Sequence, residues 1–173
     1  MDLDKFVQNH RFNFDMTFGE NCDNEELYQA TVRPLLRKMA TQIGTSATVF
    51  AYGQTGSGKT HTISSFYVAV SHDIFEIAAA LNARVSVRFF EVYGGKAFDL
   101  LAGGTHCLVQ ESAKGEVCIV GLTDCNASSP ETVEGLIDVG LQSRKTGSTS
   151  ANAQSSRSSS HSLCTEACPQ ASP

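Results

Sequence analysis

The segment from Gly53 to Thr60 has the residue types and spacing of a phosphate-binding loop. Its glycines allow a tight turn that directs several backbone N–H groups toward closely spaced phosphate oxygens. Lys59 would add a positive charge for the β- and γ-phosphates, and the Thr60 hydroxyl would bind Mg²⁺. The sequence fits G-x-x-x-x-G-K-[ST], and it predicts nucleoside triphosphate binding by Gly53, Gln54, Thr55, Gly56, Ser57, Gly58, Lys59 and Thr60.

The flanking segments bear on the alternative, which is a surface turn rich in glycine, serine and threonine. Residues 47–52 form an apolar run with β-branched and aromatic side chains, which predicts a buried strand. After the loop, apolar residues recur at spacings of three and four between Tyr67 and Leu81, which predicts an amphipathic helix. A phosphate loop requires a preceding strand and a following helix, whose N-terminus adds a partial positive charge. The setting therefore favours the phosphate site.

The C-terminal half of the chain contains further strand and helix signals. Residues 85–93 predict a strand, with Gly94-Gly95 as its turn. Residues 108–111 and 117–120 flank Lys114-Gly115 and predict a hairpin. A helix is then expected near Pro130, capped by Ser128 or Ser129.

The N-terminal part predicts a strand followed by a broken helix. Residues 11–15 alternate polar and aromatic side chains, as a half-buried strand does. Asp23 or Asn24 could cap a helix that is interrupted at Pro34. The alternation of strands and helices along the whole chain predicts an α/β layered fold.

The composition is that of a globular domain and excludes several function classes. The chain has 173 residues, 41% of them hydrophobic, and a net charge of −5. It shows neither a basic nucleic-acid-binding patch nor a polybasic or apolar membrane anchor, so we expect no nucleic-acid and no membrane partner. The charged residues that follow Met1 differ from a signal peptide, which leads us to expect a cytoplasmic location. The six cysteines lack zinc-like spacing and are expected to be free thiols.

Serine dominates the chain from Ser143 onward, where few large apolar residues remain. Such a segment buries little apolar surface to offset the entropy of ordering it, so the composition predicts a loop or tail.

Four sequence blocks in order resemble the kinesin motor domain. They are Phe50–Thr62 with the phosphate loop, Phe90–Leu101, Val120–Leu122, and Asn152–Ser158, which is similar to the first switch loop N-x-x-S-S-R-S-H. The resemblance implies a P-loop NTPase fold, in which helices cover both faces of a layered sheet, here incomplete and truncated at both ends. It implies a partial motor domain over residues 1–158 and a divergent, disordered tail over residues 159–173.

Within the family, the chain is most similar to the internal-motor kinesins (kinesin-13). The similar segments are Asp2–Phe6, Phe12–Asp15 and Thr149–Ala153. Members of that class use ATP hydrolysis to remove tubulin from microtubule ends, and a Lys-Val-Asp tip is their hallmark. Asp2 would match the acid of that tip.

The resemblance also assigns roles to individual residues. ATP and Mg²⁺ would be the ligands of the loop, with Thr60 and Ser156 on the metal. His61 would lie beside the adenine ring, the alternative being an ordinary histidine on a helix face. Ser155 and Ser156 would contact the γ-phosphate and Mg²⁺, and Arg157 would pair with an acid of the second switch loop.

Several family features do not occur in this sequence. The second switch D-x-x-G-x-E and the microtubule-binding helix after it are absent, and so is the first strand with its adenine contacts. The histidine that should follow Arg-Ser is displaced to His161 by Ser159-Ser160.

The first hypothesis is therefore an ATP-binding fragment of a microtubule motor, located in the cytoplasm on microtubules or the spindle. The second is an inactive nucleotide-binding or interaction remnant, and the third is an unrelated P-loop enzyme. Whether the chain is itself an enzyme stays open here, with inactivity expected.

Overall fold

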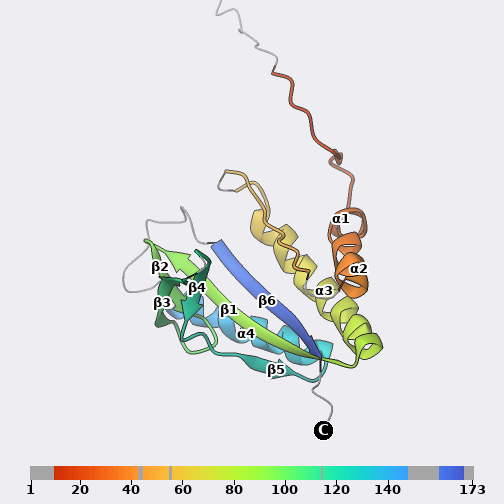
Figure 1. Ribbon diagram of the computed structural model, residues 1–173. Coiled ribbons are helices and arrows are strands. Elements are labelled where there is room, and N and C mark those ends of the chain that lie inside the picture. Colours follow the sequence, from red (N-terminus) through yellow and green to blue (C-terminus); the bar gives the residue numbers. More distant parts are fainter. Residues whose placement is uncertain (1–9, 43–44, 55, 114, 148–159, 170–173) are drawn as a thin grey trace, which may run out of the picture.

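The computed structural model describes residues 10–42, 45–54, 56–113, 115–147 and 160–169 (Figure 1). The helices in this part of the chain are α1 (Asn24–Thr31), α2 (Arg33–Thr41), α3 (Lys59–Leu81) and α4 (Pro130–Gly147). The strands are β1 (Ala83–Tyr93), β2 (Lys96–Asp99), β3 (Thr105–Glu111), β4 (Val117–Val120), β5 (Cys125–Ala127) and β6 (Ser160–Pro169). No helix of this described part is long and apolar enough to cross a bilayer.

The strands form a curled antiparallel sheet around β1 (Figure 1). Residues 85–87 of β1 pair with both β5 and β6, and residues 90–92 pair with both β2 and β6. Because a strand has two edges, β6 occupies one edge of β1, and β2 and β5 share the other. β3 and β4 extend the sheet beyond β2, in the order β4-β3-β2-β1-β5.

Helices α3 and α4 pack on one face of β1. Val85, Val87 and Phe89 alternate along the strand and are buried on that face. Phe89 lies edge-on to Tyr67 of α3, with ring centroids 6.1 Å apart. On α4, a Cβ at Gly140 would lie 2.3 Å from the Phe89 ring, so only glycine permits this close approach. The first hydrophobic core consists of Ile74, Ala78, Val85, Val87, Phe89, Leu100, Ala127, Val133 and Ile137.

Helices α1 and α2 pack on another part of α3 and form a second core. Tyr28, Val32 and Leu36 meet Phe66 of α3 there, and the rings of Tyr28 and Phe66 are 5.9 Å apart. Asp23 caps α1 by accepting a hydrogen bond from the backbone N–H of Glu26 at 2.7 Å. The helical segment breaks between α1 and α2 just before Pro34, as the sequence predicts.

The expected α/β class is confirmed, with helices layered on an incomplete sheet. The sequence led us to expect helices on both faces. In the described residues, α3 and α4 contact the same face of β1. The opposite face of β1 carries Ser86 and Arg88, which are half-buried. Arg88 forms an ion pair with Asp124 at 2.6 Å.

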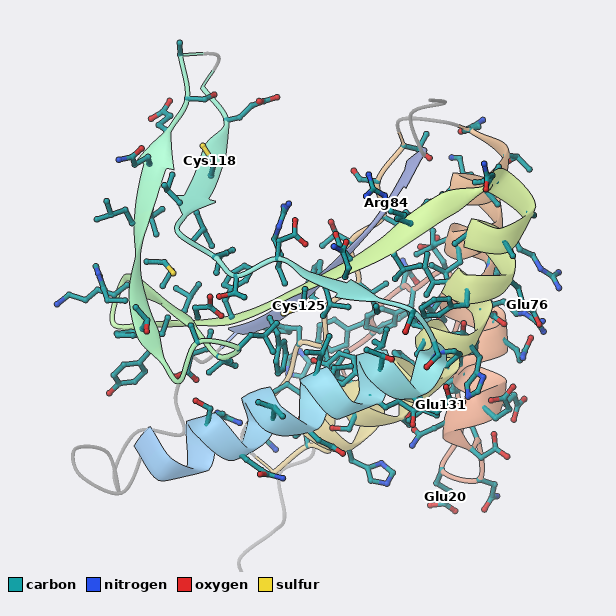
Figure 2. All side chains as sticks on the ribbon, turned by 90° about the horizontal axis from the view of Figure 1, so that it is seen from below. Glu20, Glu76, Arg84, Cys118, Cys125 and Glu131 are labelled. Carbon is teal, nitrogen blue, oxygen red and sulfur yellow. The ribbon has the colours of Figure 1, made fainter. Side chains whose placement is uncertain are left out.

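Most of the elements predicted after the phosphate loop are confirmed. The helix after the loop is α3, and the strand over residues 85–93 is β1. The predicted hairpin is β3–β4, with Leu108 paired to Val120 and Glu111 paired to Val117. It projects away from α4, and β4 carries Cys118 (Figure 2). Ser129 caps α4 by accepting a hydrogen bond from the backbone N–H of Thr132.

Two predicted strands are wrong. Residues 11–15 and 47–52 are irregular, and Phe50 and Tyr52 are 80% and 96% exposed. Alternating or apolar side chains favour a strand, but the strand backbone also needs a neighbour for its hydrogen bonds. No strand in the described part of the chain pairs with either segment.

The serine-rich C-terminal segment differs from the expected tail. Residues 160–169 form β6, which pairs with Ala83–Val92 of β1 over ten residues. Backbone hydrogen bonds to β1 along the whole segment explain how a strand with few large apolar residues joins the sheet. The boundary at residue 158 between motor domain and tail remains a prediction.

Candidate nucleotide-binding site

The predicted phosphate loop leads directly into α3 and ends at its N-terminus. Gly58 is the N-cap of α3, the residue directly before the first helical turn. Gly56 and Gly58 have φ angles of 84° and 85°, in the left-handed region that favours glycine. The two glycines adopt the angles that the motif favours, and the partial positive charge of the helix N-terminus lies at the end of the loop. The strand that the motif calls for before the loop is not formed by residues 47–52.

Lys59 folds back onto the loop. Its Nζ donates to the carbonyl oxygens of Gly53 at 2.9 Å and Gln54 at 2.6 Å. The backbone N–H of Ser57 donates to the same Gln54 carbonyl at 3.2 Å. The ammonium group thus lies against the backbone of the segment that is expected to surround phosphate.

The residue types of the loop fit a polyphosphate ligand. A Cβ at Gly53 would lie 2.6 Å from the Ser57 Oγ, so a larger residue at this position would crowd the turn. The Lys59 ammonium group, a glycine-rich turn and a helix N-terminus together supply one full charge and several N–H donors. A phosphate would compete with the two carbonyl groups for the Lys59 ammonium group.

Thr60 and His61 lie on the first turn of α3, and both are exposed. The Thr60 hydroxyl is therefore accessible to a metal ion that also binds phosphate oxygens. The Nδ1 atom of His61 lies 3.2 Å from the Nδ2 atom of Asn24, the first residue of α1. Thr55 lies outside the described residues.

The remaining predicted site residues belong to the segment that resembles the first switch loop. Ser155, Ser156 and Arg157 lie outside the described residues, so their roles stay predictions. The described residues contain no group of three or more histidine, cysteine, aspartate or glutamate side chains that could hold a metal. A magnesium ion bound mainly through phosphates and one hydroxyl needs no such cluster.

Asn24 is the residue that sequence reasoning missed. Its only signal was its place near the start of a helix, which made Asp23 and Asn24 equal candidates for the cap. The structure assigns the cap to Asp23 and leaves the Asn24 side chain to contact His61, 37 residues away in sequence. The Tyr28 hydroxyl donates to the Asp73 Oδ2 at 2.8 Å, which adds a second side-chain contact between α1 and α3.

Comparison with known proteins gives the family. The family described as Kinesin motor domain matches residues 2–169. Kinesin-like protein KIN-13A of Oryza sativa subsp. japonica is 40% identical over 163 residues, covering 91% of this chain and 20% of the relative. Kinesin-like protein KIN-13B of Arabidopsis thaliana is 40% identical over 162 residues, covering 91% of this chain and 23% of the relative.

The chain therefore spans only about a fifth of the length of these relatives. The matches extend over nearly all of its own residues, and the similarity to kinesin-13 proteins inferred from the sequence blocks is confirmed. This chain belongs to the kinesin motor-domain family.

Proposed function

We propose that this chain binds ATP and Mg²⁺ as the nucleotide-binding part of a microtubule-based kinesin motor. The observation that carries the proposal is the loop before α3, where Gly56 and Gly58 adopt left-handed φ angles and Lys59 begins the helix. This combination suits a triphosphate because it supplies backbone donors, a cation and the helix N-terminus in one short segment.

The proposal gives separate roles to residues of the loop, of α3 and of the segment around Ser156. Lys59 binds the β- and γ-phosphates, and the exposed Thr60 hydroxyl binds Mg²⁺. The metal ion, when bound, neutralises charge on the phosphates. His61 lies beside the base. Ser155 and Ser156 contact the γ-phosphate and Mg²⁺, and Arg157 pairs with an acid from elsewhere in the motor.

The partner and location follow from the family. In the longer protein, ATP hydrolysis would be coupled to movement along microtubules or to their depolymerisation, with tubulin as the partner. Both relatives are named kinesin-like proteins of the KIN-13 group, which supports the depolymerising class. The expected location is the cytoplasm, on microtubules or the spindle.

A calorimetric titration of the purified chain with ATP and Mg²⁺ tests the proposal. We expect saturable binding at one site, and we expect inorganic tripolyphosphate to compete, because the loop contacts would be made to phosphate. Omitting Mg²⁺ should weaken ATP binding, since charge on the phosphates would be less neutralised. A folded chain that shows no saturable binding of ATP would contradict the proposal.

The second candidate function is nucleotide binding without hydrolysis. The sequence contains no D-x-x-G-x-E segment, which in the family supplies a γ-phosphate contact and the acid for Arg157. Phosphoryl transfer depends on positioning the attacking water and on stabilising charge at the γ-phosphate. These 173 residues therefore favour binding over turnover.

We expect the chain alone to release phosphate from ATP no faster than its Lys59→Ala variant, with or without microtubules. Steady-state phosphate release, measured on both proteins at equal concentration, checks this. Microtubule-stimulated release well above that of the variant would show that the chain is a complete ATPase.

A further inference from the structure

We propose that Asn24 is a positioning residue for the base of the bound nucleotide and that it acts by fixing the proton of the His61 ring. The inference rests on the proposed ATP binding. It extends the site from the loop to α1, which no loop motif includes.

The contact between the two side chains restricts the histidine. The Asn24 Nδ2 and His61 Nδ1 atoms lie 3.2 Å apart. An amide nitrogen is only a donor, so in this orientation of the Asn24 amide the His61 Nδ1 atom accepts the hydrogen bond. The single proton of the neutral ring then resides on Nε2. Asn24 therefore selects one of the two tautomers and restricts the orientation of the ring.

The packing of α1 on α3 holds Asn24 in place. The Asp23 side chain accepts a hydrogen bond from the backbone N–H of Glu26 and fixes the first turn of α1, next to Asn24. The Tyr28 hydroxyl donates to Asp73 of α3 at 2.8 Å, and Arg33 forms an ion pair with the same carboxylate at 3.0 Å. Burial, together with the hydrogen bond to Asp73, raises the pKa of Tyr28, so this phenol stays protonated as a donor. These part-buried contacts with Asp73 hold the start of α1 beside α3, and with it Asn24 beside His61.

The selected tautomer suits an adenine nucleotide. His61 is on the first turn of α3, two residues after Lys59, and is exposed to a ligand held by the loop. Its ring offers a flat face for stacking and an Nε2–H donor, and purine rings present unprotonated nitrogens that accept hydrogen bonds. The reversed tautomer would lose this donor to the ring nitrogens and could only accept, from the exocyclic amino group of adenine. Asn24 would therefore affect the binding of the base and leave the phosphates unaffected.

The decisive variant is Asn24→Asp. An ionised carboxylate only accepts hydrogen bonds, so it moves the ring proton of His61 to Nδ1. An acid in the first turn of a helix is otherwise favourable, so a purely structural role of Asn24 would tolerate this change. Asn21→Asp is the matched control, because it makes the same charge change at an exposed position three residues earlier.

Two measurements on the full chain test the inference. Nitrogen-15 NMR of the imidazole at about pH 8.5, above the ordinary titration range of histidine, should place the proton on Nε2 in the parent and on Nδ1 in Asn24→Asp. Calorimetry should show ATP affinity about 3- to 10-fold lower in Asn24→Asp and Asn24→Ala, as expected for one lost hydrogen bond. Affinity for inorganic tripolyphosphate should be unchanged in both, and Asn21→Asp should bind both ligands as the parent does.

The outcomes separate this inference from the proposed function. If the parent binds ATP and the Asn24 variants bind it equally well, or if the ring proton does not move, the inference is wrong and ATP binding stands. An equal loss of affinity for ATP and tripolyphosphate would also overturn it, because the effect would then lie in the phosphate loop. A folded parent that binds no ATP would overturn both.

Discussion

Replacing Lys59 with alanine is expected to lower the affinity for ATP and Mg²⁺ by about 100-fold or more. Lys59 provides the ammonium group that the structure places against the loop, within 2.9 Å of the Gly53 carbonyl and 2.6 Å of the Gln54 carbonyl. Hydrogen bonds to charged groups contribute about 1.5–3 kcal/mol each, and about 2.7 kcal/mol corresponds to a factor of 100 in affinity. The variant also removes the two contacts that close the loop on itself.

Calorimetric titration of parent and variant measures this effect. Lys38→Ala is the matched control, because Lys38 is an exposed lysine in the last turn of α2 that has no place in the loop. The control should bind ATP as the parent does. Circular dichroism would verify that both variants retain the fold. Equal ATP affinity in the parent and in Lys59→Ala would show that the loop is not the phosphate site.

Replacing Asp99 with alanine is expected to reduce the free energy of unfolding by roughly 3–5 kcal/mol. Asp99 is fully buried at the end of β2. Its Oδ1 accepts hydrogen bonds from the backbone N–H groups of Leu101 and Ala102, at 2.8 and 3.3 Å. Its Oδ2 accepts one from the backbone N–H of Thr123 at 2.6 Å. The carboxylate joins the β2–β3 turn to the segment that leads into β5, and alanine would leave these donors without their acceptor.

Urea denaturation of parent and variant checks the second prediction. Asp138→Ala on the exposed side of α4 serves as the control, because it removes a carboxylate where no buried donor depends on it. Such surface substitutions usually change stability by no more than about 0.5 kcal/mol. A loss in Asp99→Ala as small as that in Asp138→Ala would mean that the loop hydrogen bonds are replaced by water at little cost.

The elements that the sequence predicted well have strong local signals. Helix α3 combines a glycine-rich start with apolar residues at helical spacing, and α4 has a serine cap and an early proline. The β3–β4 hairpin has two short runs with β-branched and apolar residues on either side of Gly115, whose φ is 80°. In each case, neighbouring residues in sequence determine the hydrogen bonds, so no knowledge of distant segments is needed.

The errors involve strands, whose hydrogen bonds come from distant residues. The composition of residues 47–52 favours a buried strand, yet the segment is irregular because no described strand pairs with it, and Phe50 and Tyr52 are exposed. The reverse error occurs at residues 160–169, where a polar composition suggested a tail and β1 supplies a pairing edge. Strand propensity depends on context more than helix propensity does, which explains why both errors concern strands.

The same distinction applies to the site. The phosphate loop is a single continuous motif, so its residues could be named from the sequence. The contact between Asn24 and His61 depends on how α1 packs on α3, through Tyr28 and Asp73. No spacing rule relates residues 24 and 61, and only the folded structure brings them together.

Helix α3 has a further consequence because it belongs to both hydrophobic cores. Phe66 lies in the core with α1 and α2, whereas Ile74 and Ala78 lie in the core with β1 and α4. The helix has 23 residues and is therefore about 35 Å long, with the phosphate loop at one end. Because both cores share this helix, a substitution that tilts it would disturb the packing of both and move the phosphate loop at its N-terminus.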